Sequence, residues 1–215
     1  MKKIVLLGDS IRMGYDKYVK EALSDVAEVY YPSENCRFSI HLLRFAHEWK
    51  GKGEWPDDVD LVHWNAGLWD ALELFEDGPL VPIPHYKETI VRINRRLRLL
   101  FPKAKFIFAT STSVLEGLSK SKNIKRSNRN IEDYNKAALE ALENTDTQIN
   151  DLYSFTKKLP SEYHSDAVHF ATPDGTEQIG GRVISMICKE LGIDASDVNI
   201  ENFEPECYTA ENIGY

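Results

Sequence analysis

The chain contains 215 residues, of which 42% are apolar, and it carries a formal net charge of −8. This length and composition predict one soluble domain with a substantial core, and no apolar stretch is long enough to span a bilayer. Cys36, Cys188 and Cys207 are odd in number and form no C-x-x-C pair, which argues against a disulfide framework and a cysteine zinc site. We therefore expect a cytoplasmic protein that binds neither membrane nor nucleic acid.

Apolar runs of strand length recur along the chain, at residues 3–8, 27–31, 60–65, 105–110 and about 147–153. Runs such as KIVLL and KFIFAT are continuous and do not alternate with polar residues. Continuous apolar runs are typical of strands that are covered on both faces of a sheet.

Helical patterns separate these runs. A threonine followed by proline, Thr172-Pro173, is a good N-cap and first helical residue for the last of them. Three groups of apolar residues each share one helical face: Tyr15, Val19 and Leu23; Ile90, Ile93, Leu97 and Leu100; and Ile179, Val183, Ile187 and Leu191.

Alternating strands and helices predict an α/β protein with right-handed crossovers and a parallel sheet. The expected fold class is a three-layer α/β/α sandwich with a flavodoxin-like five-stranded parallel sheet, in which any site is expected at the carboxyl ends of the strands. Two insertions, residues 66–85 and the basic loop 111–128, follow predicted strands and are expected to overhang that site.

The end of the chain is acidic. Residues 193–215 contain six carboxylate side chains and no Lys or Arg, so they carry six of the eight net negative charges. We divide the chain into a domain at residues 1–192 and an acidic tail at residues 193–215.

The segment IVLLGDSIRMGY places Ser10 where the first strand ends and a helix begins. A serine hydroxyl becomes a good nucleophile only with a base in reach that is itself oriented by a third group. Asp166 and His169 lie three residues apart just before the last predicted helix, a spacing at which the carboxylate can accept the imidazole Nδ1–H.

Together, the GDSIRMG and DAVH segments resemble the GDSL, or SGNH, hydrolases, over roughly residues 3–192. The resemblance implies Ser10 as nucleophile, His169 as general base and then acid, and Asp166 as the orienting carboxylate. It implies a serine esterase that cleaves small acyl esters, such as O-acetyl groups on carbohydrate, with no cofactor and no metal. The partner it implies is a small-molecule ester substrate.

The family's oxyanion-binding blocks match less well. The resemblance places oxyanion donors at the Ser10 and Cys36 backbone N–H groups, but Trp69 stands where the family has an asparagine. Asn65, two residues before Gly67, is the preferred substitute donor, and Asn35 is the alternative. Asn35, Gly67 and Trp69 are the expected substrate-binding residues.

Other interpretations remain open from the sequence. The Gly-Asp-Ser turn can simply cap a helix in a non-catalytic, flavodoxin-like domain that binds carbohydrate or phosphate. His164, Asp166 and His169 can also be considered as metal ligands, although their spacing fits no strong zinc motif. A homo-oligomer is compatible with the sequence.

Overall fold

The computed structural model describes residues 1–118 and 123–200. Its central sheet has five parallel strands in the order β2-β1-β3-β5-β7. These strands are β1 (Lys2–Leu7), β2 (Ala27–Tyr30), β3 (Leu61–Trp64), β5 (Lys105–Ala109) and β7 (Gln148–Asn150). The order is flavodoxin-like, which confirms the predicted fold class.

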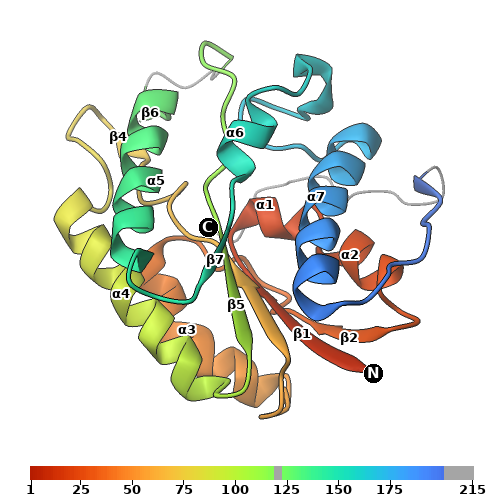
Figure 1. Cartoon of the computed structure of the whole chain (residues 1–215). Coiled ribbons are helices and arrows are strands. Elements are labelled where there is room, and N and C mark those ends of the chain that lie inside the picture. Colours follow the sequence, from red (N-terminus) through yellow and green to blue (C-terminus); the bar gives the residue numbers. More distant parts are fainter. Residues whose placement is uncertain (119–122, 201–215) are drawn as a thin grey trace.

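Helices cover both faces of this sheet (Figure 1). One layer contains α3 (Ser39–Lys52), α4 (Ile83–Leu100) and α5 (Asn128–Leu142); the other contains α2 (Asp16–Ala22) and α7 (Pro173–Leu191). The short helices α1 (Ser10–Met13) and α6 (Leu152–Thr156) and the 3-10 turn η1 (Ser161–Tyr163) lie in connections outside the strands.

The strands divide the core into two apolar clusters because neighbouring residues point to opposite faces. Val5 and Leu7 of β1 pack with the α3, α4 and α5 layer, whereas Ile4 and Leu6 pack with the α2 and α7 layer. All four side chains are completely buried. This explains why β1 is apolar at every position of its second half.

The predicted helical faces are buried except at two of their last residues, since Leu100 and Leu191 are half-buried. Ile90, Ile93 and Leu97 of α4 have no exposed surface. At the start of α7, Thr172 Oγ1 accepts a hydrogen bond from the Gly175 N–H, and Pro173 is the first helical residue.

The last strand ends earlier than the sequence suggests. The apolar run at residues 147–153 predicts one strand, but β7 stops at Asn150 and α6 starts at Leu152. Asp151 separates the two because its carboxylate accepts the Ser154 N–H and caps α6. A side-chain cap inside an apolar run therefore turned its second half into a helix.

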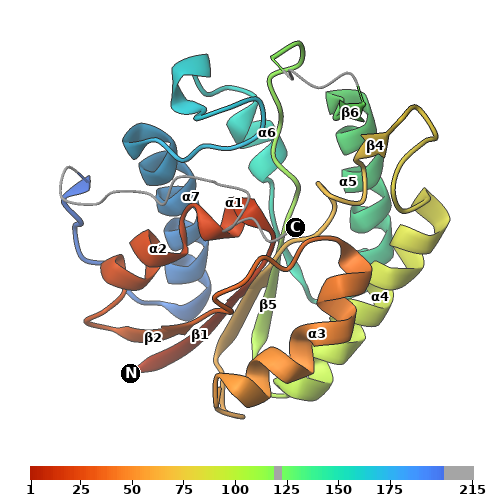
Figure 2. The ribbon, with the colours of Figure 1, turned by 180° about the vertical axis from the view of Figure 1, so that it is seen from behind.

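The two insertions meet in a small second sheet that the sequence did not predict. Strands β4 (Glu73–Leu74) and β6 (Ile124–Lys125) pair antiparallel, and Figure 2 shows them beyond the carboxyl ends of the central strands. Within the same region, Lys120 and Lys122 of the basic loop lie outside the described residues.

The first residues of the acidic segment contact α2 and its following turn. The Ser196 N–H donates to the Ala22 carbonyl oxygen, and the Ser196 hydroxyl donates to the Asp25 carboxylate. Residues 201–215, which carry most of the tail's carboxylates, lie outside the described residues. No helix in the described ranges is long and apolar enough to cross a membrane.

Candidate active site

The turn after β1 brings Ser10 to the start of α1. Asp9 is the N-cap residue, and its Oδ1 accepts the Ile11 N–H at 3.0 Å. Gly8 is required for close packing, since a Cβ at this position would lie 1.9 Å from Asn65 Oδ1 and 2.8 Å from Arg12 Cβ. Ser10 therefore sits at a fixed point, with its backbone N–H in the first helical turn, where no intrahelical acceptor exists.

The loop before α7 carries Asp166 and His169. Asp166 Oδ1 accepts the backbone N–H groups of Val168 at 2.7 Å and His169 at 2.8 Å. The same loop is closed by a bond from the Ser165 N–H to the His169 carbonyl oxygen at 2.8 Å. The carboxylate thus shapes the turn through one oxygen and leaves its second oxygen for the imidazole.

These two segments, far apart in the sequence, meet in a continuous chain of hydrogen bonds. Ser10 Oγ lies 2.8 Å from His169 Nε2, and His169 Nδ1 lies 2.7 Å from Asp166 Oδ2. With Nδ1 donating to the carboxylate, Nε2 is the nitrogen that can accept the serine proton. This is the geometry that a hydroxyl needs to be deprotonated as it attacks.

The electrostatics keep Asp166 charged. Partial burial alone would raise the pKa of Asp166, but the hydrogen bond and charge of His169 and the two backbone N–H donors outweigh it. The pKa of this carboxyl therefore lies well below its usual range. An ionised Asp166 both orients the imidazole and stabilises the imidazolium that forms when His169 takes a proton.

Asp9, beside Ser10, is fully buried and is not part of this chain of hydrogen bonds. Burial raises the pKa of Asp9, while contacts with Asn65 and the Ile11 N–H act in the opposite direction. Since Asp9 Oδ1 caps α1, its place is structural.

The predicted oxyanion donor at Cys36 needs correction. The Cys36 N–H donates to the Gly8 carbonyl oxygen at 3.1 Å, so this N–H is already used to join the loop after β2 to the turn after β1. Cys36 is completely buried, and burial raises the pKa of its thiol to about 12. The residue is thus a packing element, not a reactive thiol or an available donor.

Asn65 and Asn35 both lie near the turn but are held differently. The Asn65 N–H donates to the Leu7 carbonyl oxygen, and its side-chain amide packs directly against Gly8. Asn35 Oδ1 instead accepts the Arg37 N–H at 2.7 Å. Both side chains are almost completely buried, at 5% exposed for Asn65 and 2% for Asn35.

Gly67 and Trp69 belong to the segment that follows β3. Gly67 has φ +143°, and a Cβ there would lie 2.7 Å from Ser111 Oγ and 2.8 Å from the Tyr86 hydroxyl, so this position packs against neighbours. Trp69 is half-buried. Arg126 Nε donates to the Leu68 carbonyl oxygen, and the Arg126 guanidinium lies 6.0 Å from the centroid of the Trp69 ring. Trp69 and Arg126 thus form part of the rim built by the two insertions.

Sequence reasoning missed the role of Arg12. Its guanidinium is 1% exposed, pairs with Asp16, and donates to the carbonyl oxygens of Pro32 at 2.9 Å and Glu34 at 2.7 Å. Arg12 thereby fixes the loop after β2 beside the Ser10 helix. The groups that accept the Arg12 hydrogen bonds are backbone carbonyls about twenty residues further along the chain. Every residue has such a carbonyl, so the sequence contains no motif that identifies these partners.

His164, Asp166 and His169 do not form a metal centre in the described part of the chain. The His164 ring packs at a tilt against Phe170 with ring centroids 3.8 Å apart, while His169 is hydrogen-bonded to Asp166 and Ser10. No group of three potential ligands among the described residues is arranged to hold an ion.

The fold has known counterparts, although the sequence matches no protein-family model and no curated protein. A lipase/acylhydrolase from Enterococcus faecalis is 20% identical, with a TM-score of 0.68 over 92% of this chain and 100% of that chain. An acetyl xylan esterase is 17% identical, with a TM-score of 0.66 over 86% of this chain and 99% of that chain. A GDSL-like lipase from Bacteroides thetaiotaomicron is 18% identical, with a TM-score of 0.63 over 87% of this chain and 88% of that chain. The chain thus shares the fold of GDSL-like lipases and acylhydrolases.

Proposed function

We propose that this protein is a serine esterase of the SGNH type that works through an acyl-enzyme. One observation carries the proposal: the unbroken hydrogen-bond chain from Ser10 Oγ through His169 to Asp166, with contacts of 2.8 Å and 2.7 Å. A turn that only capped a helix would not require an imidazole and a carboxylate aligned on the serine hydroxyl.

In the first half of the reaction, Ser10 Oγ bonds to the ester carbonyl carbon while His169 Nε2 takes the hydroxyl proton. The carbonyl oxygen carries the resulting negative charge. When the intermediate collapses, the bond to the alkoxy oxygen breaks and His169 returns its proton to the leaving alcohol. Asp166 stays ionised and stabilises the imidazolium between these steps.

In the second half, water attacks the acyl carbon and gives a proton to His169. Collapse of this intermediate releases the carboxylic acid and returns the proton to Ser10 Oγ. The oxyanion donors in this proposal are the Ser10 N–H at the start of α1 and the side-chain NH₂ group of Asn65, a residue whose Oδ1 lies against Gly8 in the same turn.

We further propose short-chain acyl esters as substrates, with O-acetylated carbohydrate as the favoured class. The half-buried Trp69 ring on the rim offers the kind of aromatic face on which a sugar ring can stack. The acetyl xylan esterase with the same fold makes this class the first to test.

The proposal is tested by replacing Ser10 with alanine and measuring hydrolysis of p-nitrophenyl acetate. Hydrolysis by S10A is expected to fall to the background rate, while the thermal unfolding midpoint stays close to that of the unchanged protein. A fluorophosphonate probe should label the unchanged protein at Ser10, with the adduct located by peptide mass spectrometry. A non-catalytic binding domain would give no labelling, and its p-nitrophenyl acetate signal would be the same in S10A.

A further inference from the structure

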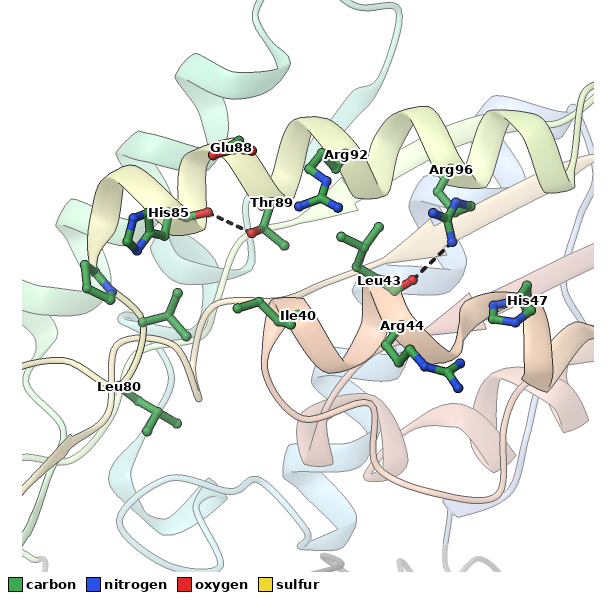
Figure 3. Close-up of a pocket in the computed structure, with 12 residues that line it drawn as sticks. Ile40, Leu43, Arg44, His47, Leu80, His85, Glu88, Thr89, Arg92 and Arg96 are labelled. Carbon is green, nitrogen blue, oxygen red and sulfur yellow. Dashed lines mark hydrogen bonds between the residues drawn. The ribbon is translucent and has the colours of Figure 1, made fainter.

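A hollow lies between α3 and α4, and Ser10, His169 and Asp166 are not among the residues that line it. This α3–α4 groove has a volume of about 680 Å³ and is lined by both helices and by residues 80–82 (Figure 3). Its volume falls in the range of sites that hold small organic ligands. No residue of the catalytic hydrogen-bond chain takes part in it.

One end of the groove is basic. Arg44 and His47 come from α3, and Arg92 and Arg96 come from α4, one helical turn apart. Figure 3 shows the guanidinium groups of Arg92 and Arg96 reaching from α4 into the space toward α3. Glu88 is the single carboxylate among the lining residues, so the groove has the opposite sign to the chain as a whole.

The cations differ in how far neighbouring groups satisfy them. Arg44 pairs with Glu48 at 2.5 Å, and Arg96 makes a long bond of 3.5 Å to the Leu43 carbonyl oxygen. Arg92 is exposed and has no ion-pair or hydrogen-bond partner within residues 1–118 and 123–200. Like charges one turn apart on a helix repel each other, and an anion bound between them would relieve that repulsion.

The other end of the groove is apolar. Ile40 at the start of α3 is 48% exposed, and Leu80, in the segment before α4, is 43% exposed. Large aliphatic side chains from two separate segments are therefore open to solvent on the same groove as the guanidinium groups. A fully hydrophilic anion bound in the groove would leave Ile40 and Leu80 exposed to water. A neutral apolar molecule would provide no negative charge for the guanidinium groups.

We infer that the α3–α4 groove binds a small amphiphilic anion: a carboxylate or phosphate head group on Arg92 and Arg96, with an aliphatic chain along Ile40 and Leu80. Guanidinium groups form paired hydrogen bonds to either oxyanion, and the apolar end covers the chain. Binding at this groove does not depend on the Ser10 chemistry, so each proposal can fail without the other.

The test is calorimetric titration of the full-length protein with decanoate and with decyl phosphate, below their micelle concentrations. Both are expected to bind saturably, whereas decanol and inorganic phosphate should bind at least tenfold more weakly. Exchanging both Arg92 and Arg96 for alanine should weaken decyl phosphate binding more than tenfold. Ile40→Ser should weaken decyl phosphate binding and leave the weak binding of inorganic phosphate unchanged.

Arg95→Ala is the matched control, because Arg95 is an exposed arginine on α4 that does not line the groove. It should bind decyl phosphate as the unchanged protein does. The inference is overturned if neither probe binds saturably, if decanol binds as well as decanoate, or if Arg95→Ala loses as much affinity as the double variant. It is also overturned if the groove proves to join two copies of the chain, seen as a dimer that the double variant dissociates.

Discussion

The two oxygens of the Asp166 carboxylate have separate partners, and this separation decides what an amide would do in its place. Oδ1 accepts two backbone N–H groups, while Oδ2 accepts the His169 Nδ1–H. In Asp166→Asn, the amide oxygen must stay with the backbone donors, because an NH₂ group there would face two N–H groups. The amide NH₂ then faces His169 Nδ1.

Asp166→Asn is therefore expected to fix the wrong imidazole tautomer. Nδ1 would become an acceptor and Nε2 would carry the proton, so His169 could not accept the Ser10 proton. We expect kcat for p-nitrophenyl acetate to fall by about a thousandfold to ten-thousandfold at neutral pH, with little change in the unfolding midpoint. A loss of less than tenfold would mean that Asp166 does not set the tautomer.

Two asparagines, Asn65 and Asn35, are the candidates for the side chain that donates to the oxyanion. Asn65 is the preferred donor because it packs against Gly8, in the turn that holds Ser10. The Arg37 N–H donates to Asn35 Oδ1, but an oxyanion accepts from an amide NH₂ group, so this bond does not decide between the two side chains. We expect Asn65→Ala to lower kcat by about a hundredfold to a thousandfold with KM almost unchanged, because the lost interaction forms with the oxyanion. Asn35→Ala is the matched variant and should lower kcat much less. The opposite ranking would assign the donor to Asn35.

Among the structural elements, α7 controls the position of His169. Its N-cap Thr172 accepts the Gly175 N–H and donates its own hydroxyl to the Tyr163 carbonyl oxygen at 2.9 Å. A Cβ at Gly175 would lie 2.3 Å from the Tyr163 carbonyl oxygen and 2.5 Å from that of Phe170. The start of α7 is therefore packed directly against the loop that presents the imidazole.

Gly175→Ala is expected to displace this loop and lower kcat/KM by about a hundredfold, since a shift of about 1 Å in a catalytic group has an effect of that size. Gly181→Ala on the same helix has nothing within 4 Å of its Cβ. It should leave kcat/KM unchanged and raise the free energy of unfolding by roughly 0.5–1 kcal/mol through helix propensity. Steady-state kinetics and urea unfolding of both variants separate the two effects.

The elements that could be predicted from the sequence are those whose signal is local. The strand β1 contains a continuous apolar run at residues 4–7, and Thr172-Pro173 and an apolar face indicate α7. The β4–β6 pairing was missed because each strand has two residues and no periodic pattern, and its stability depends on two insertions meeting in space. Arg12 was missed for the same reason, since its acceptors are carbonyls of a distant loop.

At the scale of the whole molecule, the strand order explains why the candidate site lies where it does. The chain passes from β1 outward to β2 and then crosses to β3 on the other side of β1. Connections leave in opposite directions at this point, and in open α/β sheets this is where sites form, at the carboxyl ends of the strands. Ser10 follows β1 and Asn65 follows β3, so both lie at this edge of the sheet. The strand and helix pattern of the sequence predicted that the site lies at this edge of the sheet. It could not show that the Cys36 N–H donates to the Gly8 carbonyl oxygen, because this bond depends on how the loop after β2 packs.

A buried contact between Asp70, in the segment after β3, and Ser39, at the start of α3, is expected to make the stability of the molecule depend on pH. Asp70, which is completely buried, accepts hydrogen bonds from the Ser39 N–H at 3.0 Å and the Ser39 hydroxyl at 2.5 Å, at the start of α3. Burial raises the pKa of Asp70 to about 6, and the bonds from Ser39 only partly oppose this effect.

A raised carboxyl pKa means that the fold favours the neutral form relative to the unfolded chain. The contribution of Asp70 to the free energy of unfolding is therefore fully present below about pH 4 and is lost as the pH rises through about 6. Its size is on the order of 3 kcal/mol, since each pKa unit corresponds to about 1.4 kcal/mol.

Asp70→Asn removes this titration while keeping an oxygen that can accept the Ser39 N–H. The unfolding free energy of the unchanged protein, taken relative to that of Asp70→Asn, should fall by roughly 2–3 kcal/mol between pH 4 and pH 7 and then level off. Urea unfolding of both proteins at a series of pH values measures this difference, and the slope of the transition checks that both unfold in one step. A difference that stays constant with pH would show that Asp70 ionises in the folded protein as freely as in the unfolded chain, and that the helix start is hydrated instead of closed.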